Sequence, residues 1–160
     1  MNLEIRDVGH EDREWVRELL ADRWGSAGVV TRGILHQADT LPGFLALADG
    51  KPEGLLTYRI SGGDCEIVTL DSLLERCGIG SALINAVRTL AQSGGCRRLW
   101  LITTNDNIPA QEFYQKRGFR IRAIHRGTID QSRKLKLEIP EKGIGGVLIR
   151  DEIEMEIKLR

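Results

Sequence analysis

Residues 65–80 read CEIVTLDSLLERCGIG, and this stretch decides the fold. The apolar and β-branched run from Cys65 to Leu70 predicts a strand, whereas Ile79–Gln92 carries apolar residues at helical spacing. Gly78-Ile79-Gly80 lies where the chain enters that helix. Glycines at a helix start let a ligand approach the backbone, and the free N–H groups of the first turn favour a phosphate. The junction therefore predicts either an anion-binding loop or a plain tight turn.

Two named phosphate motifs do not fit this junction. The dinucleotide fingerprint G-x-G-x-x-G would place glycine or alanine at position 83, where the chain has Leu83. The chain also lacks the Gly-Lys-Ser/Thr string of a P-loop. The ligand is therefore some other phosphate compound, or there is none.

A second informative stretch, residues 104–119, reads TNDNIPAQEFYQKRGF. It follows the apolar run Leu99–Thr103, which predicts a strand covered on both faces. Pro109 is suited to the first turn of a helix, which we expect from about Ile108 to Lys116, with Gly118 as its end.

The remaining elements are placed by hydrophobic periodicity around these two stretches. Ser26–Thr40 and Gly127–Gly146 carry no clear pattern. The predicted strands lie at about Leu3–Ile5, Phe44–Ala48, Gly54–Ile60, Cys65–Leu70, Leu99–Thr103, from Phe119 onward and at Ile149–Leu159, and the helices at Glu11–Trp24, Ile79–Gln92 and Ile108–Lys116. This order predicts an α+β domain with a mixed sheet.

Composition narrows the classes of function. The 160 residues carry 23 Lys+Arg and 23 Asp+Glu, so the formal net charge is zero, and 41% are hydrophobic. Length and composition predict one globular domain with a sizeable core. The balanced charge argues against nucleic-acid or membrane-surface partners, because both select a basic excess. No apolar run approaches the ~18 residues of a membrane span.

Cysteine and histidine usage adds two further expectations. The three cysteines form no C-x-x-C pair, so reduced thiols in a cytoplasmic protein are the simplest account. The three histidines lie far apart in the sequence, so no metal site is expected. The acidic, interrupted segment from Met1 to Asp7 does not have the features of a signal peptide.

Taken together, the two stretches resemble the GNAT superfamily of acyl-CoA-dependent N-acyltransferases. Gly78-Ile79-Gly80 matches the end of that family's acetyl-CoA motif, Arg/Gln-x-x-Gly-x-Gly/Ala. The family's second pattern, Asn-x-x-Ala-x-x-Phe/Leu-Tyr…Gly-Phe, is matched by Asn107, Ala110, Phe113, Tyr114, Gly118 and Phe119.

The resemblance has one departure and one refinement. Glu75 occupies the position where the family usually has Arg or Gln, and the neighbouring Arg76 is expected to supply the missing donor. The string Thr103–Asn107 and the tail Arg150–Ile153 resemble a bacterial subgroup with undefined substrates.

The resemblance implies a single N-acetyltransferase domain over residues 1–160. Its sheet would be mixed, mostly antiparallel and twisted, with about six to seven strands, flanked by helices and splayed between two central parallel strands. Acetyl-CoA would lie in the splay without any metal. The residues expected to bind it are Val68 and Leu70 through their backbone, Arg76, Cys77, Gly78, Gly80 and Ser81 through N–H groups, Asn107 and Tyr114.

The resemblance also implies a direct attack of an amine on the thioester. Tyr114 is expected to act as general acid on the departing thiolate, because a phenol is protonated at neutral pH. The Leu70 N–H would stabilise the oxyanion. Glu66, or Asp64 on the same face, would take the proton of the amine, directly or through a water. Asn107 either binds the pantetheine or caps the following helix.

The predicted activity is acetyl transfer from acetyl-CoA to a primary amine of a small molecule or a protein. The alternatives are a longer acyl-CoA donor and a non-catalytic acyl-CoA sensor. Family members often dimerise, and the alternating strand Ile149–Leu159 offers a surface for a homodimer. Its acidic side, Glu152, Glu154 and Glu156, would then need Arg150 and Lys158 of a second copy.

Overall fold

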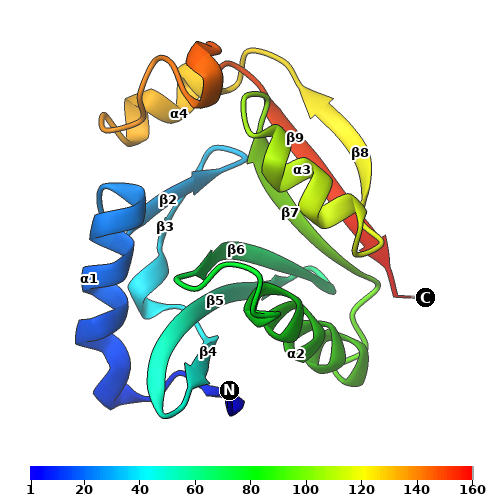
Figure 1. The fold of residues 1–160 in the computed structure, drawn as a ribbon. Helices are drawn as coiled ribbons and strands as arrows, with labels where there is room; N and C mark the ends of the chain where they lie inside the picture. The colour runs from blue at the N-terminus through cyan, green and yellow to red at the C-terminus, as the bar shows by residue number, and fades with distance from the viewer. Residues whose placement is uncertain (160) are drawn as a thin grey trace.

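The computed structural model describes residues 1–159 and contains a seven-stranded sheet (Figure 1). In sheet order, the strands are β1 (Leu3–Asp7), β4 (Gly43–Ala48), β5 (Lys51–Ser61), β6 (Asp64–Ser72), β7 (Arg98–Thr104), β9 (Glu152–Lys158) and β8 (Arg120–His125). β6 and β7 run parallel, and the other neighbouring strands of this sheet are antiparallel. The predicted α+β fold with its mixed, mostly antiparallel sheet is confirmed.

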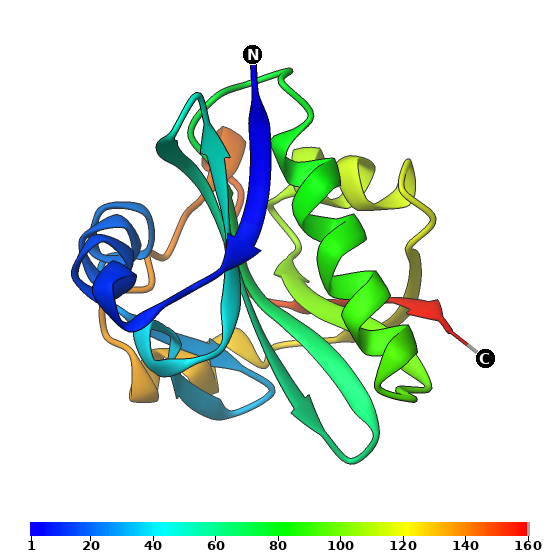
Figure 2. The same cartoon turned by 90° about the horizontal axis from the view of Figure 1, so that it is seen from below.

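Helices cover both faces of the sheet. In Figure 2, α1 (Arg13–Trp24) lies on one side, and α2 (Ile79–Ser93) and α3 (Ile108–Gln115) lie on the other. Each face has its own buried core, because the strands alternate their side chains between the two faces. The core on the α2 side includes Leu83, Val87, Leu99, Leu101 and Met155, and the core on the α1 side includes Val16, Leu20, Leu45, Leu55 and Val68.

The parallel strands β6 and β7 pair only briefly and then separate. Their ladder runs from Cys65–Leu99 to Ile67–Leu101, whereas β6 continues along β5 as far as Ser72. A bulge interrupts the β5–β6 ladder at Val68, where the register shifts. Bulges bend a strand and redirect the side chains that follow. The predicted splay is therefore present, and it begins at the bulge.

The segment that the sequence left without a pattern forms a second, small sheet. β2 (Gly28–Thr31) and β3 (Ile34–Gln37) make a hairpin, followed by a short 3-10 helix at Ala38–Thr40. Both turn residues have positive φ, 48° at Arg32 and 77° at Gly33, as a two-residue hairpin turn requires. Arg-Gly is not among the strong hairpin signals, so this turn was not recognised in the sequence.

The structure corrects the prediction of a half-buried final strand. β9 lies between β7 and β8, and every residue from Glu152 to Ile157 is buried. Pairing of this strand with a second copy of the chain is therefore excluded, because both of its edges already carry a neighbour. A homodimer through another surface stays a prediction.

Arg98 explains how three acidic side chains can be buried or nearly buried side by side. Its guanidinium lies 2.7 Å from Glu154, 3.0 Å from Glu156 and 3.0 Å from Asp64, and it stacks over the ring of Trp100. His125 makes a further contact with Glu154 at 2.9 Å. Buried charges need such partners, because desolvation is costly without them.

Two other observations bear on the class of protein. The three cysteines are free thiols, as predicted from their spacing. Among residues 1–159, no helix is long and apolar enough to cross a membrane.

Candidate active site

A cavity of about 530 Å³ occupies the space between the diverging strands. It is lined by Val68, Leu70 and Asp71 from β6, Ile102 and Thr103 from β7, and Asn107, Ala110 and Tyr114 from α3 and its N-terminal cap. Because the ladder with β7 ends at Ile67, the β7-facing backbone of β6 has no strand partner beyond that residue. Backbone N–H and C=O groups on this edge are available to a ligand.

A second cavity of about 340 Å³ adjoins the first at the N-terminus of α2. The two share Leu70, Ala110 and Tyr114. Gly78 caps α2 in a left-handed conformation, φ 75°, without a side-chain hydrogen bond. The free N–H groups of the first turn therefore face this cavity with the positive end of the helix dipole. The predicted site residues on its wall are Leu70, Arg76, Cys77, Gly78, Gly80, Ser81 and Tyr114.

Gly80 has a packing role that the sequence did not reveal. A Cβ at this position would lie 2.7 Å from the ring of Phe113, so the missing side chain lets α3 approach α2. Arg117 reinforces the contact, because its Nε donates to Ser81 Oγ at 2.8 Å and its guanidinium stacks 3.5 Å over the Phe113 ring. Arg117 also lines the second cavity and adds a positive charge beside the helix start.

Tyr114 lies where the two cavities meet. Its ring packs edge-on against Phe113 and Phe119, which fixes the direction of the side chain. Burial raises the pKa of Tyr114 well above its ordinary value, and the charge of Asp71 raises it further. Among residues 1–159, no side chain forms a hydrogen bond with the Tyr114 hydroxyl. The site thus contains a protonated phenol whose hydroxyl is free to serve a ligand.

The polar string before α3 turns out to be structural. Asn107 Oδ1 accepts from Ala110 N at 3.2 Å and caps α3. Its side chain also lines the splay, so binding of the pantetheine stays a prediction. Asn105 Oδ1 accepts from the N–H groups of Arg150 and Asp151. Asp106 accepts from Ile144 N at 3.0 Å. Together, Asn105 and Asp106 hold the segment 144–151 against the mouth of the splay.

Glu66 is buried away from the cavities rather than lining one. Its exposed fraction is 2%, and Thr31 Oγ1, which also contacts His36, donates to it at 2.7 Å. Burial raises its pKa. None of the walls of the cavities described here includes Glu66. Asp64 is engaged with Arg97 and Arg98 at the other end of the strand.

A third cavity, of about 390 Å³, lies between α1, β2 and α4 (Ile129–Leu135). Trp24 and Arg23 line both this cavity and the splay. Trp24 Nε1 donates to Asp71 Oδ2 at 2.9 Å, so α1 is tied to the end of β6. The resemblance placed Trp24 near the acceptor site, either as a core or helix-end residue or as a platform for the substrate, and the sequence did not single out Asp71. The bulge at Val68 and the pairing of Asp71 with Leu55 place that carboxylate on the α1 face, and neither is readable from periodicity.

Comparison with known proteins agrees with this geometry. The chain belongs to the acetyltransferase (GNAT) family, whose model matches residues 9–119. It is 42% identical over 142 residues to the uncharacterized protein YdhI of Bacillus subtilis, and the match covers 88% of this chain and 89% of that one.

Solved structures share the fold over nearly the whole chain. An IAA acetyltransferase from Bacillus cereus aligns with a TM-score of 0.75 at 22% identity, covering 98% of this chain and 99% of that one. A GNAT family acetyltransferase from Elizabethkingia anophelis with acetyl-CoA bound aligns with a TM-score of 0.71 at 19% identity, covering 98% of both chains.

Proposed function

We propose that this chain transfers the acetyl group of acetyl-CoA to a primary amine by direct attack. The observation that carries the proposal is the hydroxyl of Tyr114, protonated, without a side-chain partner and placed where the splay meets the helix-start cavity. A thioester donor fits this arrangement, because its phosphates and its sulfur would occupy different cavities that Tyr114 joins.

The proposed donor site uses mainly backbone groups. Val68 and Leu70 offer the unpaired edge of β6 to the pantetheine amides. The N–H groups of Arg76, Cys77, Gly78, Gly80 and Ser81 face the pyrophosphate at the N-terminus of α2, an arrangement that suits an anion without a metal. Arg117 adds a charged contact on the same wall.

In the proposed reaction, the amine nitrogen bonds to the thioester carbon, and the oxyanion is stabilised by the Leu70 N–H. Holding both reactants in place removes the need for a covalent enzyme intermediate. The C–S bond then breaks, and the thiolate takes the proton of Tyr114. Glu66 fits the role of base less well, since Thr31 already binds its carboxylate and no cavity described here reaches it.

The decisive experiment measures thiol release from acetyl-CoA over a panel of primary amines, together with acetyl-CoA affinity by calorimetry. Turnover that needs an amine supports the proposal. Binding of acetyl-CoA with no turnover on any amine would instead indicate an acyl-CoA sensor. Parallel runs with longer acyl-CoA thioesters determine the chain length that the site accepts.

A matched pair at Gly78 tests the helix-start cavity. The position has φ 75°, and a Cβ added there would have no neighbouring atom within 4 Å, so Asn and Asp, which both tolerate this conformation, fit equally. Gly78→Asp places a negative charge beside the pyrophosphate and is expected to bind CoA about tenfold more weakly than Gly78→Asn. Calorimetry with CoA gives both constants, and equal affinities would contradict the assignment.

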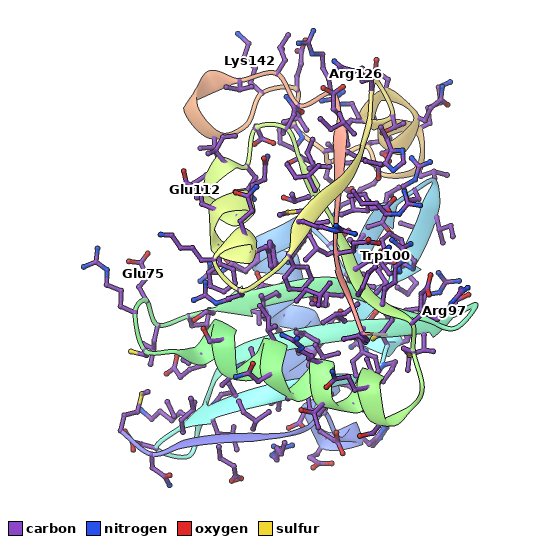
Figure 3. All side chains as sticks on the ribbon, turned by 90° about the vertical axis from the view of Figure 1, so that its right-hand side faces the viewer. Glu75, Arg97, Trp100, Glu112, Arg126 and Lys142 are labelled. Atoms are coloured by element: carbon purple, nitrogen blue, oxygen red, sulfur yellow. The ribbon has the colours of Figure 1, made fainter. Side chains whose placement is uncertain are left out.

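Glu75 is expected to weaken donor binding. It lines the helix-start cavity on a loop that projects outward (Figure 3). Glu75→Gln removes an exposed negative charge, so CoA affinity should rise about two- to fivefold at low salt and the gain should shrink as salt screens it. Glu112→Gln, an exposed change on α3 outside the cavity walls, is the control. Unchanged or lower affinity of Glu75→Gln would show that the carboxylate lies away from the phosphates.

A further inference from the structure

Trp24 connects two oppositely charged side chains that line neighbouring cavities. Its indole Nε1 donates to Asp71 Oδ2 at 2.9 Å, and its backbone oxygen accepts from Lys136 Nζ at 2.6 Å. Asp71 lines the splay beside Tyr114, and Lys136 lines the cavity between α1 and α4. Because Trp24 lines both cavities, a molecule that lies along its side chain would have Asp71 at one end and Lys136 at the other.

Asp71 is the carboxylate that the splay offers to an amine. One of its oxygens is held by Trp24, while Oδ1 has no hydrogen-bond partner among residues 1–159 and is not sealed from the cavity. It shares the splay with Tyr114, and Glu66 does not reach it. Burial raises the pKa of Asp71 despite the Trp24 hydrogen bond, so its carboxylate is a better proton acceptor than an exposed aspartate.

Lys136 lacks an anionic partner. Its exposed fraction is 8%, and its ammonium group has one hydrogen bond, to the neutral oxygen of Trp24, and no ion pair within the described residues. Burial lowers its pKa. The walls around it are mostly apolar and include Val29, Val30, Ile129, Ile139 and Ile149. A buried ammonium in apolar surroundings gains from an anion that enters the cavity.

Two further charged side chains stand at the rim of this cavity. Arg23 lines it as well as the splay, and its side chain is 43% exposed, so it adds positive charge where the two cavities meet. Glu138 also lines this cavity and is exposed. Its charge partly offsets the lowering of the Lys136 pKa by burial, but it makes no ion pair with Lys136 among the described residues. With two cations and one carboxylate on its walls, the cavity carries a net positive charge.

We propose that the acceptor is a small molecule with both an ammonium group, which binds Asp71, and a carboxylate or phosphate group, which binds Lys136. This inference rests on the proposed acetyl transfer and names its acceptor class. The ammonium gives one proton to Asp71, and the freed lone pair forms the C–N bond. The C–S electron pair leaves on sulfur, which takes the proton of Tyr114. The second nitrogen proton is lost as the amide forms and restores Tyr114 through solvent, and Asp71 releases its proton to solvent.

Paired acceptors test this class directly. Free amino acids and their carboxamides differ in the anionic group and in the pKa of the amine, so thiol release from acetyl-CoA is measured over both series at equal concentrations of the ammonium form. The wild type should prefer the free acids. Lys136→Gln should lower kcat/KM for the acids about ten- to hundredfold and leave the amides nearly unchanged. Asp71→Asn should lower kcat/KM for both series by about 10²–10⁴-fold. Lys134→Gln, an exposed change on α4, is the control for charge alone.

Acetyl-CoA affinity is measured for every variant, and an unchanged affinity shows that the fold and the donor site are intact. A wild type that turns over amides as well as acids, a Lys136→Gln variant with an unchanged preference, or an Asp71→Asn variant at the parent rate overturns the acceptor class while acetyl transfer stands. Aminoalkyl phosphates in place of the acids separate phosphate from carboxylate. If neither series is turned over while other primary amines are, the acceptor class is overturned and acetyl transfer stands. Acetyl-CoA bound without turnover on any amine, or not bound at all, overturns the proposed function itself.

Discussion

Tyr114→Phe is expected to reduce turnover by about 10²–10⁴-fold, the usual contribution of a general acid. The change removes one hydroxyl and keeps the ring that packs against Phe113 and Phe119, so folding and CoA binding should change little. The loss should appear in kcat more than in the KM for acetyl-CoA, because the hydroxyl acts when negative charge develops on sulfur. Steady-state and single-turnover rates with acetyl-CoA measure it.

Tyr58→Phe is the matched control for this prediction. Tyr58 is the other tyrosine of the chain, is 8% exposed and stacks on Phe44, and it lines neither donor cavity. It should keep the parent turnover. If Tyr114→Phe also turns over at the parent rate where chemistry is rate-limiting, Tyr114 is a packing residue and the proposed proton donor is wrong.

Arg98→Met is expected to destabilise the fold by about 3–5 kcal/mol near neutral pH, the usual cost of removing one partner from a buried ion pair. The change leaves Asp64, Glu154 and Glu156 without their common cation while nearly conserving the volume of the side chain. Urea unfolding of both proteins measures the difference. Arg97→Met is the control, because Arg97 is 69% exposed and its ion pair with Asp64 should contribute at most about 1 kcal/mol.

The difference in the free energy of unfolding between the parent and Arg98→Met should depend on pH in one direction. Burial alone would raise the pKa of Glu154, but its hydrogen bonds with Arg98 and His125 outweigh burial, and the pKa is lowered. A carboxylate with a lowered folded-state pKa stabilises the fold above its unfolded pKa of about 4.5, and that contribution is lost as the pH falls through the folded value. The gap between the parent and Arg98→Met should therefore narrow in acid. A gap that is constant from neutral to acid pH would show that Arg98 stabilises by packing.

The sequence predicted the elements whose signals are local. The period-2 and helical patterns gave the meander of β4 to β6, the helix at Ile79 and the strand at Leu99, with ends within a few residues of those observed. The hairpin over residues 28–37 was missed, because its strands are short and its Arg32-Gly33 turn is unusual. Burial of both faces of β9 was missed because it depends on cations from other strands, above all Arg98.

The site residues also fall into those that local motifs mark and those that only long-range contacts bring together. The glycine-rich helix start and Tyr114 are marked by motifs, and the structure brings them onto adjoining cavity walls. Glu66 was singled out by its strand position, yet the β2–β3 hairpin covers it with Thr31. Asp71 and Lys136 meet through Trp24, across 47 and 112 residues of sequence, and no local pattern reports a contact of that range.

Segment 140–151 is attached in a way that determines where this acetyltransferase-family scaffold can diversify. The groups that hold it, from Asn105, Asp106 and Arg133, bond to main-chain atoms of the segment. Side chains such as Val147 and Leu148 are exposed and make no part of that attachment. Val147 and Leu148 can therefore be exchanged without moving the wall of the splay, whereas Ile144 lines that wall and Gly145 and Gly146 have positive φ. The two exposed positions are suitable for libraries that seek new acceptors while the donor site is left intact.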